Sequence, residues 1–135
     1  QDVLVGIANN GQWYRLDVNG TTVDVVYVGS YGGGYSSSGD AYSIKNVGTY
    51  AAVNSSLKWN DYLVAVDPAN GKVNSEVGPI GNYSEIYGLA GWTGKAFAFD
   101  SGGDILIIDT TTGEVSLAVS TDHAWWGAGV RTEIN

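Results

Sequence analysis

The feature of this sequence that most restricts its fold is a hairpin signature that occurs more than once. Residues 62–73 and 105–115 each contain an apolar strand ending in Asp, a short turn closed by Gly, and a second strand. An Asp carboxylate can accept hydrogen bonds from the turn backbone, and Gly accepts positive φ, so the two residues together close a hairpin. Residues 13–23 carry a copy that is one residue shorter, so the sequence predicts three related β-hairpins.

The spacing of these hairpins indicates a repeat protein. Their anchoring residues Asp17, Asp67 and Asp109 lie 50 and 42 residues apart, close to the roughly 40–50-residue period of propeller repeats. Each hairpin is preceded by a segment of alternating character that is typical of a strand, at 3–8, 49–53 and 95–99. A further strand is predicted at 41–44, 84–90 and 124–129. The repeating unit therefore contains four strands.

This register predicts an all-β fold in a single domain, 1–135, built from three four-stranded antiparallel propeller blades. The N-terminal unit begins at its second strand, whereas the strand at 124–129 has no partners after it. The two ends are therefore expected to complete one split blade, which removes exposed strand edges. In this alignment Tyr87-Gly88 corresponds to Trp126-Gly127 and, more weakly, to Tyr42. The glycine-rich stretch at 30–39 is expected to be a flexible surface loop.

The turn sequences that begin at Asp67 and Asp109 resemble those of quinoprotein-like and lectin-like blades in secreted bacterial β-propellers. The resemblance extends loosely over nearly the whole chain and implies a propeller fold. Such repeats normally carry a tryptophan after the turn glycine, where this chain has Val77 and Val119. No quinone or other cofactor is therefore expected.

Three blades do not close into a ring by themselves, because propellers typically have about four to eight. The simplest solution is a twofold pair of chains that forms a six-bladed ring, a homodimer with closed symmetry. Two alternatives remain open at this point. The chain is a fragment of a longer propeller, or its three sheets form a prism with pseudo-threefold symmetry, as in some plant lectins of similar length.

Charge and composition exclude several partners. The formal net charge is −8, with only six Lys and Arg, so no nucleic-acid partner is expected. No apolar run approaches the roughly 20 residues of a membrane-spanning helix, and no membrane insertion is expected. The absence of cysteine excludes disulfides and thiolate metal sites. Because residue 1 is Gln, we expect either a trimmed chain or an exported one that has lost a signal peptide and is secreted, extracellular or periplasmic.

The sequence predicts no catalytic residues and no metal site. The single histidine, His123, adjoins Asp122, but neighbours on a strand point to opposite faces and form no acid–base pair. A glycosidase needs two carboxylates at a fixed separation. The acidic residues near aromatic ones are interpreted as solvated turn carboxylates; they are Glu85, Asp100, Asp104 and Asp122. The segment 100–104 also lacks the closing Glu of a calcium loop.

Aromatic residues are the best candidates for function. The chain has five Trp and nine Tyr, and the apolar faces of sugar rings stack well on aromatic rings. The candidate ligand-binding residues are Trp59, Trp92, Trp125, Tyr87, Trp126 and Asp122. Packing between repeats is the favoured alternative for Tyr42, Tyr87 and Trp126. The three other tryptophans adjoin polar or loop residues and are the better ligand candidates.

The sequence therefore predicts a non-catalytic extracellular binding module, with carbohydrate as the favoured ligand. A ring that carries several sites would gain avidity from multivalency. The first alternative is a structural or adhesive protein-interaction domain. The second is a glycosidase-like or other hydrolase.

Overall fold

The computed structural model describes residues 3–129, and every regular element within them is a β-strand. The strands are β1 (Leu4–Ile7), β2 (Gln12–Asn19), β3 (Thr22–Ser30), β4 (Tyr35–Ile44), β5 (Gly48–Ser55), β6 (Tyr62–Val66), β7 (Val73–Pro79), β8 (Ile86–Trp92), β9 (Lys95–Asp100), β10 (Asp104–Ile108) and β11 (Val115–Ser120). Over this range no helix could cross a membrane. The prediction of an all-β fold is confirmed for residues 3–129.

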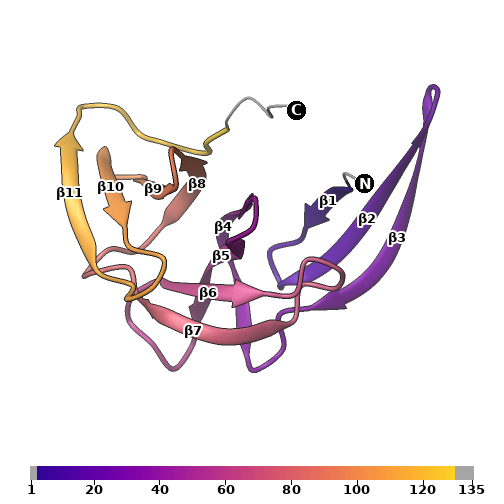
Figure 1. Ribbon diagram of the computed structural model, residues 1–135, viewed down its shortest axis with the longest axis horizontal. Coiled ribbons are helices and arrows are strands. Elements are labelled where there is room, and N and C mark those ends of the chain that lie inside the picture. Colours follow the sequence, from indigo (N-terminus) through magenta and orange to yellow (C-terminus); the bar gives the residue numbers. More distant parts are fainter. Residues whose placement is uncertain (1–2, 130–135) are drawn as a thin grey trace.

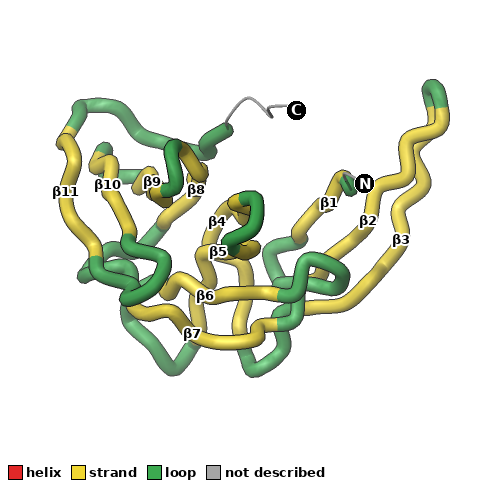
Figure 2. Tube along the Cα trace, in the orientation of Figure 1, coloured by secondary structure: helices red, strands yellow, loops and turns green. Residues whose placement is uncertain are grey.

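The strands form three antiparallel sheets, each a meander of consecutive strands. The first sheet contains β1 to β3, the second β4 to β7 and the third β8 to β11. Figure 1 shows the sheets side by side in an open arc, with β3, β7 and β11 toward its convex side. Loops and tight turns connect the strands (Figure 2). Residues 3–129 do not close into a ring or a barrel.

The predicted four-stranded units are confirmed in two sheets and are incomplete in the remaining one. The first sheet begins at β1, which is the second strand of the predicted unit. Residues 124–129, predicted as its missing strand, form no strand. They lie against β8, where the backbone of Gly127 approaches Gly88, and β1 lies across the arc from β8 (Figure 1). The predicted split blade is therefore not formed within the described part of the chain.

The core lies in two layers, one on each side of the second sheet. Trp13 packs with side chains of β5 and β6 between the first and second sheets. Leu106 belongs to the layer between the second and third sheets. Successive residues of β5 face opposite layers, because Ala51 and Val53 contact the first layer and Ala52 contacts the second. This burial of both faces explains why β5 contains a continuous apolar run instead of an alternating one.

Two of the three predicted hairpin turns have the expected geometry. The Asp67 carboxylate accepts the backbone N–H two residues further on at 2.8 Å, and the N–H of Gly71 donates to the Asp67 carbonyl at 2.7 Å. Asp109 makes the corresponding bonds, and the N–H of Thr112 above all lowers the pKa of its carboxyl below the usual value. Gly71 and Gly113 have φ angles of 74° and 77°. Side-chain acceptor and glycine act together in both turns, as predicted.

The first hairpin turns differently. β2 continues past Asp17 to Asn19, which pairs with Thr22 across a two-residue turn. Asp17 lies within the strand and accepts two hydrogen bonds from Arg15, at 2.8 and 2.9 Å. The prediction that Asp17 anchors a turn is wrong, because a two-residue turn leaves no loop backbone for its carboxylate to bind.

The predicted flexible loop at 30–39 is partly a strand. β4 begins at Tyr35, and residues 35–37 pair with the end of β5. The ladder is then interrupted between Ser37 and Ala41, where β4 carries extra residues. Such an irregularity is a β-bulge, which bends the strand while most of its hydrogen bonds are kept.

One backbone hydrogen bond recurs at the exit from every sheet and aligns the repeats. In each case the residue after the last strand donates to the residue before the second-to-last strand: Tyr31 to Gly11 at 3.1 Å, Ile80 to Asp61 at 2.8 Å and Thr121 to Gly103 at 2.9 Å. Since Ile80 is equivalent to Thr121, Tyr87 corresponds to Ala128. The predicted match of Tyr87-Gly88 with Trp126-Gly127 is therefore displaced by two residues, because it followed aromatic identity instead of distance from this junction.

Candidate functional site

The structure brings some of the predicted ligand-binding residues together and separates others. Tyr87 and Trp126 form a pair, and Trp125 lies in the same segment after β11. Trp59 lies alone in the loop between β5 and β6. Trp92 lies at the end of β8, next to the turn into β9. Trp125 contacts the β9–β10 loop, which lies at the opposite end of the third sheet. These residues do not form one site.

Tyr87 and Trp126 stack face to face. Their ring centroids are 5.2 Å apart and their planes differ by 9°. Tyr87 is half-buried, whereas Trp126 remains 75% exposed. The pair therefore combines both sequence interpretations: one face of Trp126 packs on the neighbouring segment, and much of its remaining surface lies in solvent.

Trp125 and its neighbours form a second cluster. The indole N–H of Trp125 donates to the Gly103 carbonyl at 3.3 Å, and its ring packs edge-on against Phe99 with centroids 5.8 Å apart. His123 lies edge-on to the same indole, and its Nε2 is 3.5 Å from Oδ1 of Asp122. The expectation that Asp122 and His123 point to opposite faces is wrong, because this segment is not a strand. The Asp122 side chain is 95% exposed.

The most exposed aromatic residue lies in the Trp59 loop, residues 56–61 between β5 and β6. Trp59 is 99% exposed and Leu57 is 89% exposed. The residues between and after them are tied to the protein, since the Lys58 N–H donates to the Ser55 carbonyl at 3.0 Å and the Asn60 side-chain amide donates to the Gly81 carbonyl at 2.8 Å. The loop therefore presents two apolar side chains from a backbone that is held on both sides.

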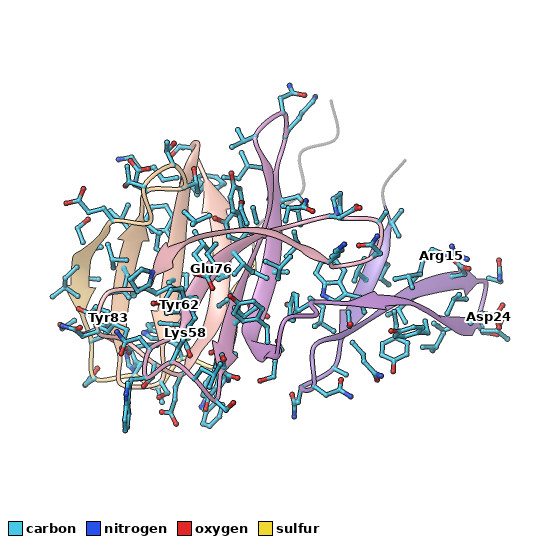
Figure 3. The ribbon with its side chains drawn as sticks, turned by 90° about the horizontal axis from the view of Figure 1, so that it is seen from below. Arg15, Asp24, Lys58, Tyr62, Glu76 and Tyr83 are labelled. Atoms are coloured by element: carbon cyan, nitrogen blue, oxygen red, sulfur yellow. The ribbon has the colours of Figure 1, made fainter. Side chains whose placement is uncertain are left out.

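A charged and aromatic cluster supports the Trp59 loop from beneath. The Lys58 Nζ lies 2.8 Å from a Glu76 carboxylate oxygen and 3.7 Å from the centroid of the Tyr62 ring. The Tyr35 hydroxyl donates to the same carboxylate. Figure 3 shows Lys58, Tyr62 and Glu76 close together on the face viewed from below, whereas Arg15 and Asp24 lie on the β2–β3 hairpin. Ion pair and cation–π contact together restrict the Lys58 side chain.

The Trp59 loop ends at a buried carboxylate that the sequence analysis missed. Asp61 is buried, and its Oδ2 accepts the Ile86 N–H at 2.9 Å as well as the Ser38 hydroxyl. Burial raises the pKa of the Asp61 carboxyl above its usual value, although these two donors oppose the shift. The residue thereby joins the loop to both β4 and β8. No local pattern separates Asp61 from the other loop carboxylates, because its partners lie 23 and 25 residues away in the sequence.

The other carboxylates considered for catalysis hold turns together. Asp100 accepts the Asp104 N–H at 2.8 Å, and Asp104 accepts the Ser120 hydroxyl at 2.6 Å. Glu85 accepts the Ser101 hydroxyl at 2.6 Å. Within residues 3–129, no three His, Cys, Asp or Glu side chains are grouped closely enough to hold a metal ion. These contacts assign structural roles to the three carboxylates.

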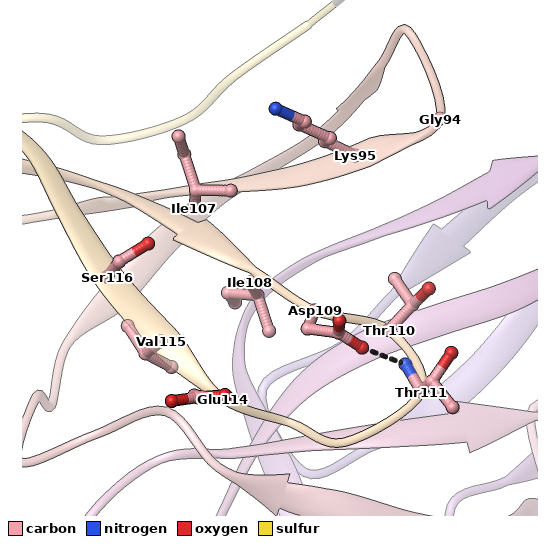
Figure 4. Close-up of a pocket in the computed structure, with 10 residues that line it drawn as sticks. All are labelled: Gly94, Lys95, Ile107, Ile108, Asp109, Thr110, Thr111, Glu114, Val115 and Ser116. Carbon is pink, nitrogen blue, oxygen red and sulfur yellow. Dashed lines mark hydrogen bonds between the residues drawn. The ribbon is translucent and has the colours of Figure 1, made fainter.

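An open hollow of about 470 Å³ lies at the turn end of the third sheet (Figure 4). Its charged lining residues are Lys95, Asp109 and Glu114. The dashed line in Figure 4 marks the bond by which Asp109 accepts the Thr111 N–H, at 2.7 Å, so this carboxylate is engaged in its own turn. The hollow lies at the opposite end of the sheet from the loop that Trp125 contacts.

Comparison with known proteins identified no relative. No protein-family model, no curated protein and no solved structure matches this chain. No family is therefore assigned, and the resemblance to propeller blades stays a prediction.

Proposed function

We propose that this protein is a non-catalytic extracellular binding module that recognises carbohydrate, with Trp59 as the principal contact. The observation that carries the proposal is the combination of full exposure and restraint in the Trp59 loop. Because the backbone is restrained, binding has to order only the indole side chain and not the loop that carries it, which lowers the entropic cost of recognition. This is the energetic situation of an aromatic anchor in a recognition surface.

The chemistry around Trp59 suits a sugar. The indole offers a flat apolar face for the C–H side of a pyranose ring. Polar residues close by in the sequence can exchange hydrogen bonds with ring hydroxyls; they are Asn54 and Ser56, both exposed, and Asn60 through its Oδ1, since its amide nitrogen donates to Gly81. A binding surface for single sugar rings needs one such platform and a few polar groups, not a deep cavity.

Trp126, stacked on Tyr87, is proposed as a second platform. Its exposed surface provides an apolar face, and the same segment carries the polar side chains of Asp122 and His123, which lie beside Trp125. Trp92, 56% exposed, is a third candidate at the other end of the sheet. Trp125 is assigned a supporting role, since its N–H and ring are both engaged. Separate weak sites of this kind become useful through multivalency.

We further propose that the three sheets are propeller-type blades and that two chains assemble into a six-bladed ring. Each sheet is an antiparallel meander, and the sheets pack face to face in an arc that stays open within residues 3–129 (Figure 1). A homodimer would bring two copies of each candidate site into one particle. The two rival architectures are further blades in one longer chain and a closed prism of three sheets.

Adhesive protein interaction is the second candidate function. The observation in its favour is Leu57, which is exposed beside Trp59 on the same loop. An aliphatic side chain next to an indole resembles the centre of a protein–protein contact more than a sugar platform. Binding of a protein partner that depends on both Leu57 and Trp59 would favour this function.

A glycan array followed by titration of tryptophan fluorescence tests the carbohydrate proposal. The wild-type chain should bind at least one glycan class, and Trp59→Ala should weaken that binding about tenfold or more, as expected for loss of a contact worth about 1.4 kcal/mol. Val47→Ala is the control, because Val47 is an exposed apolar residue directly before β5, at the opposite end of that strand from the Trp59 loop, and this variant should retain the affinity. Absence of binding to every glycan, or an unchanged affinity in Trp59→Ala, would overturn the proposal.

A further inference from the structure

The third sheet packs on the second through a close backbone contact, and the C-terminal segment repeats this contact on the third sheet. A Cβ placed on Gly39 in β4 would lie 2.1 Å from the Ile86 carbonyl oxygen and 2.6 Å from the Tyr87 Cα. A Cβ on Gly88 in β8 would lie 2.8 Å from the Gly127 carbonyl carbon and 3.0 Å from the Ala128 nitrogen. In both places only glycine permits the two backbones to approach.

The two contacts are equivalent in the repeat. Ile80 and Thr121 occupy the same junction position, as their backbone hydrogen bonds establish. The same offset of 41 residues converts Ile86 into Gly127. The C-terminal segment, residues 124–129, therefore lies beside β8 as β8 lies beside β4. It occupies the position that the first strand of one more blade would have.

The sheet that lacks a first strand is the first sheet, and its β1 edge is open. Within residues 3–129, β1 pairs with β2 alone. In the third sheet, Ile86 of β8 pairs with Asp100 of β9. The strand positions of β9 and β1 are equivalent, so the same pairing would set Gly127 opposite Ala8. Unpaired N–H and C=O groups along such an edge are a template for another strand.

The outer face of the first sheet is apolar and uncovered. Alternation along β2 places Trp13 on the face that packs against the second sheet, and its immediate neighbours on the other face. The exposed side chains on this outer face are Leu4, Val18, Val23, Val25 and Tyr27. The charged pair Arg15–Asp17 lies on the Trp13 face instead. A face with this composition is expected to be covered.

The outer face of the third sheet is apolar as well. Leu106 and Ile108 point into the core beside the second sheet, so the residues that alternate with them point outward. The outward side chains, which pair across the sheet, are Phe97, Phe99, Ile105, Ile107 and Val119. The arc therefore ends in two apolar faces, one on its first sheet and one on its third, and the C-terminal segment covers part of the third-sheet face where Trp125 contacts Phe99.

The first and third sheets also depart from the repeat in two ways that complement each other. Where sheets pack within the chain, the Asp-x-x-x-Gly turn of one sheet seats on a glycine of the sheet before it: Asn70 lies against Gly29, and Gly113 against Gly78. The third sheet has Val119 at the position equivalent to Gly78, which leaves no room for such a turn. The first sheet has the tight two-residue turn instead. Among the described residues, the third sheet is the one whose last strand lacks this glycine. The β2–β3 hairpin is the one whose short turn does not need it.

We infer that the C-terminal segment pairs with the β1 edge of a second copy of this chain, while the outer face of the third sheet covers that copy's first sheet. The inference rests on the proposed ring and specifies how it closes: each chain completes its partner's incomplete sheet by a reciprocal exchange. The partner is a second copy because the two ends of the arc are complementary. The C-terminal segment matches the open β1 edge, the two apolar faces can pack on each other, and the short β2–β3 turn matches the position of Val119.

Cysteine cross-linking between two separately prepared chains tests this exchange. The chain has no cysteine of its own, so Ala8→Cys in one preparation and Gly127→Cys in another supply one thiol each. Gly127 has open space where its Cβ would lie. Directly opposite residues of antiparallel strands have Cα atoms about 4.5–5.5 Å apart, which a disulfide can span. Oxidation of the mixture should give a dimer that contains one chain of each kind.

The matched control replaces Ala8→Cys by Leu57→Cys, an exposed thiol on the second sheet, which should give only the background of random collisions. Light scattering of the unmodified chain supplies the second readout. A mass of twice 14.2 kDa with cross-linking above the control supports the exchange. A dimeric mass without specific cross-linking overturns the exchange and leaves the ring standing. A mass of one chain, or a mixture that cross-links no better than the control, overturns the inference, and the monomeric mass overturns the ring too.

Discussion

Gly71 lies directly against the indole of Trp13. A Cβ on Gly71 would be 2.3 Å from three carbons of that ring, and the backbone there has a φ of 74°. The turn of the second sheet is thus seated on the buried tryptophan that connects the first sheet to the core. Gly71 serves two purposes: it closes its own turn, and it lets the turn reach the neighbouring sheet.

Gly71→Ala should therefore destabilise the protein more than an ordinary Gly→Ala change in a turn. Gly94→Ala is the matched control, since Gly94 has a φ of 75° but nothing within 4 Å of the added carbon. We expect Gly94→Ala to lower the free energy of unfolding by about 1 kcal/mol from backbone strain. Gly71→Ala should lower it by a further 1–3 kcal/mol, approximately, from overpacking. Equal urea midpoints for the two variants would contradict the seating of the turn on Trp13.

The buried carboxyl of Asp61 predicts a pH dependence of stability with a defined sign. Its pKa is raised from the ordinary 3.8 in the folded chain, so the folded chain holds its proton more strongly than the unfolded chain does. Its contribution to stability is fully present below the ordinary pKa and is lost as the pH rises through the raised folded pKa. Asp61→Asn has no proton to lose and should gain stability relative to wild type over that rise.

Urea unfolding from about pH 3 to pH 8 measures the effect for wild type and Asp61→Asn. Asp109→Asn provides a control of opposite sign, since the pKa of Asp109 is lowered by turn N–H donors. The stability that Asp109 contributes is present above its ordinary pKa and lost as the pH falls. A stability difference between wild type and Asp61→Asn that stays constant with pH would show that Asp61 does not titrate in this way.

Lys58 should matter for recognition more than for stability. Exposed ion pairs contribute about 0–1 kcal/mol, so Lys58→Gln should shift the urea midpoint little. It releases the contacts to Glu76 and Tyr62, and the Trp59 loop should then bind its glycan several-fold more weakly. Arg15→Gln removes another exposed ion pair on the distant hairpin and should leave binding unchanged. Equal affinities for the two variants would argue against a preorganised loop.

Asp40 should hold the C-terminal segment in place. Its Oδ2 accepts the N–H groups of Leu89 at 3.3 Å and Ala128 at 3.1 Å, so one carboxylate ties β8 and that segment to β4. Asp40→Ala should speed hydrogen exchange at Ala128 by about tenfold or more, as expected when a bond to a charged acceptor is lost. Asp40→Asn, which keeps an acceptor, should exchange at an intermediate rate. Asp24→Ala, an exposed change on β3, is the control and should have no effect there.

Local pattern was sufficient for most of the strands and for two of the turns, whereas the strand predicted at 124–129 did not form and the loop predicted at 30–39 is partly β4. Alternating and continuous apolar runs predicted the strands, and the turns at Asp67 and Asp109 formed as expected because both partners of each hydrogen bond lie within a few residues. The same reasoning was wrong for Asp17. The two-residue turn lies beyond Asp17, because β2 continues to Asn19. An Asp residue alone does not indicate where its strand ends.

Less of the candidate site than of the fold could be predicted from the sequence. Trp59 was among the predicted residues, but its restraint depends on Glu76 and Gly81, which lie 18 and 21 residues from the side chains they bind. Asp61 was not recognised at all. Matching aromatic residues also misaligned Tyr87 with Trp126, although the two side chains prove to lie against each other.

The sequence by itself determined an all-β chain of antiparallel meanders, because strand alternation and turn chemistry act between near neighbours. Only the tertiary structure decided how the sheets pack and which side chains remain in water. The close approaches at Gly39, Gly71 and Gly88 each bring together residues from different repeats. Glycine is required at these positions because atoms of another residue lie where its Cβ would be, and that residue is distant in the sequence.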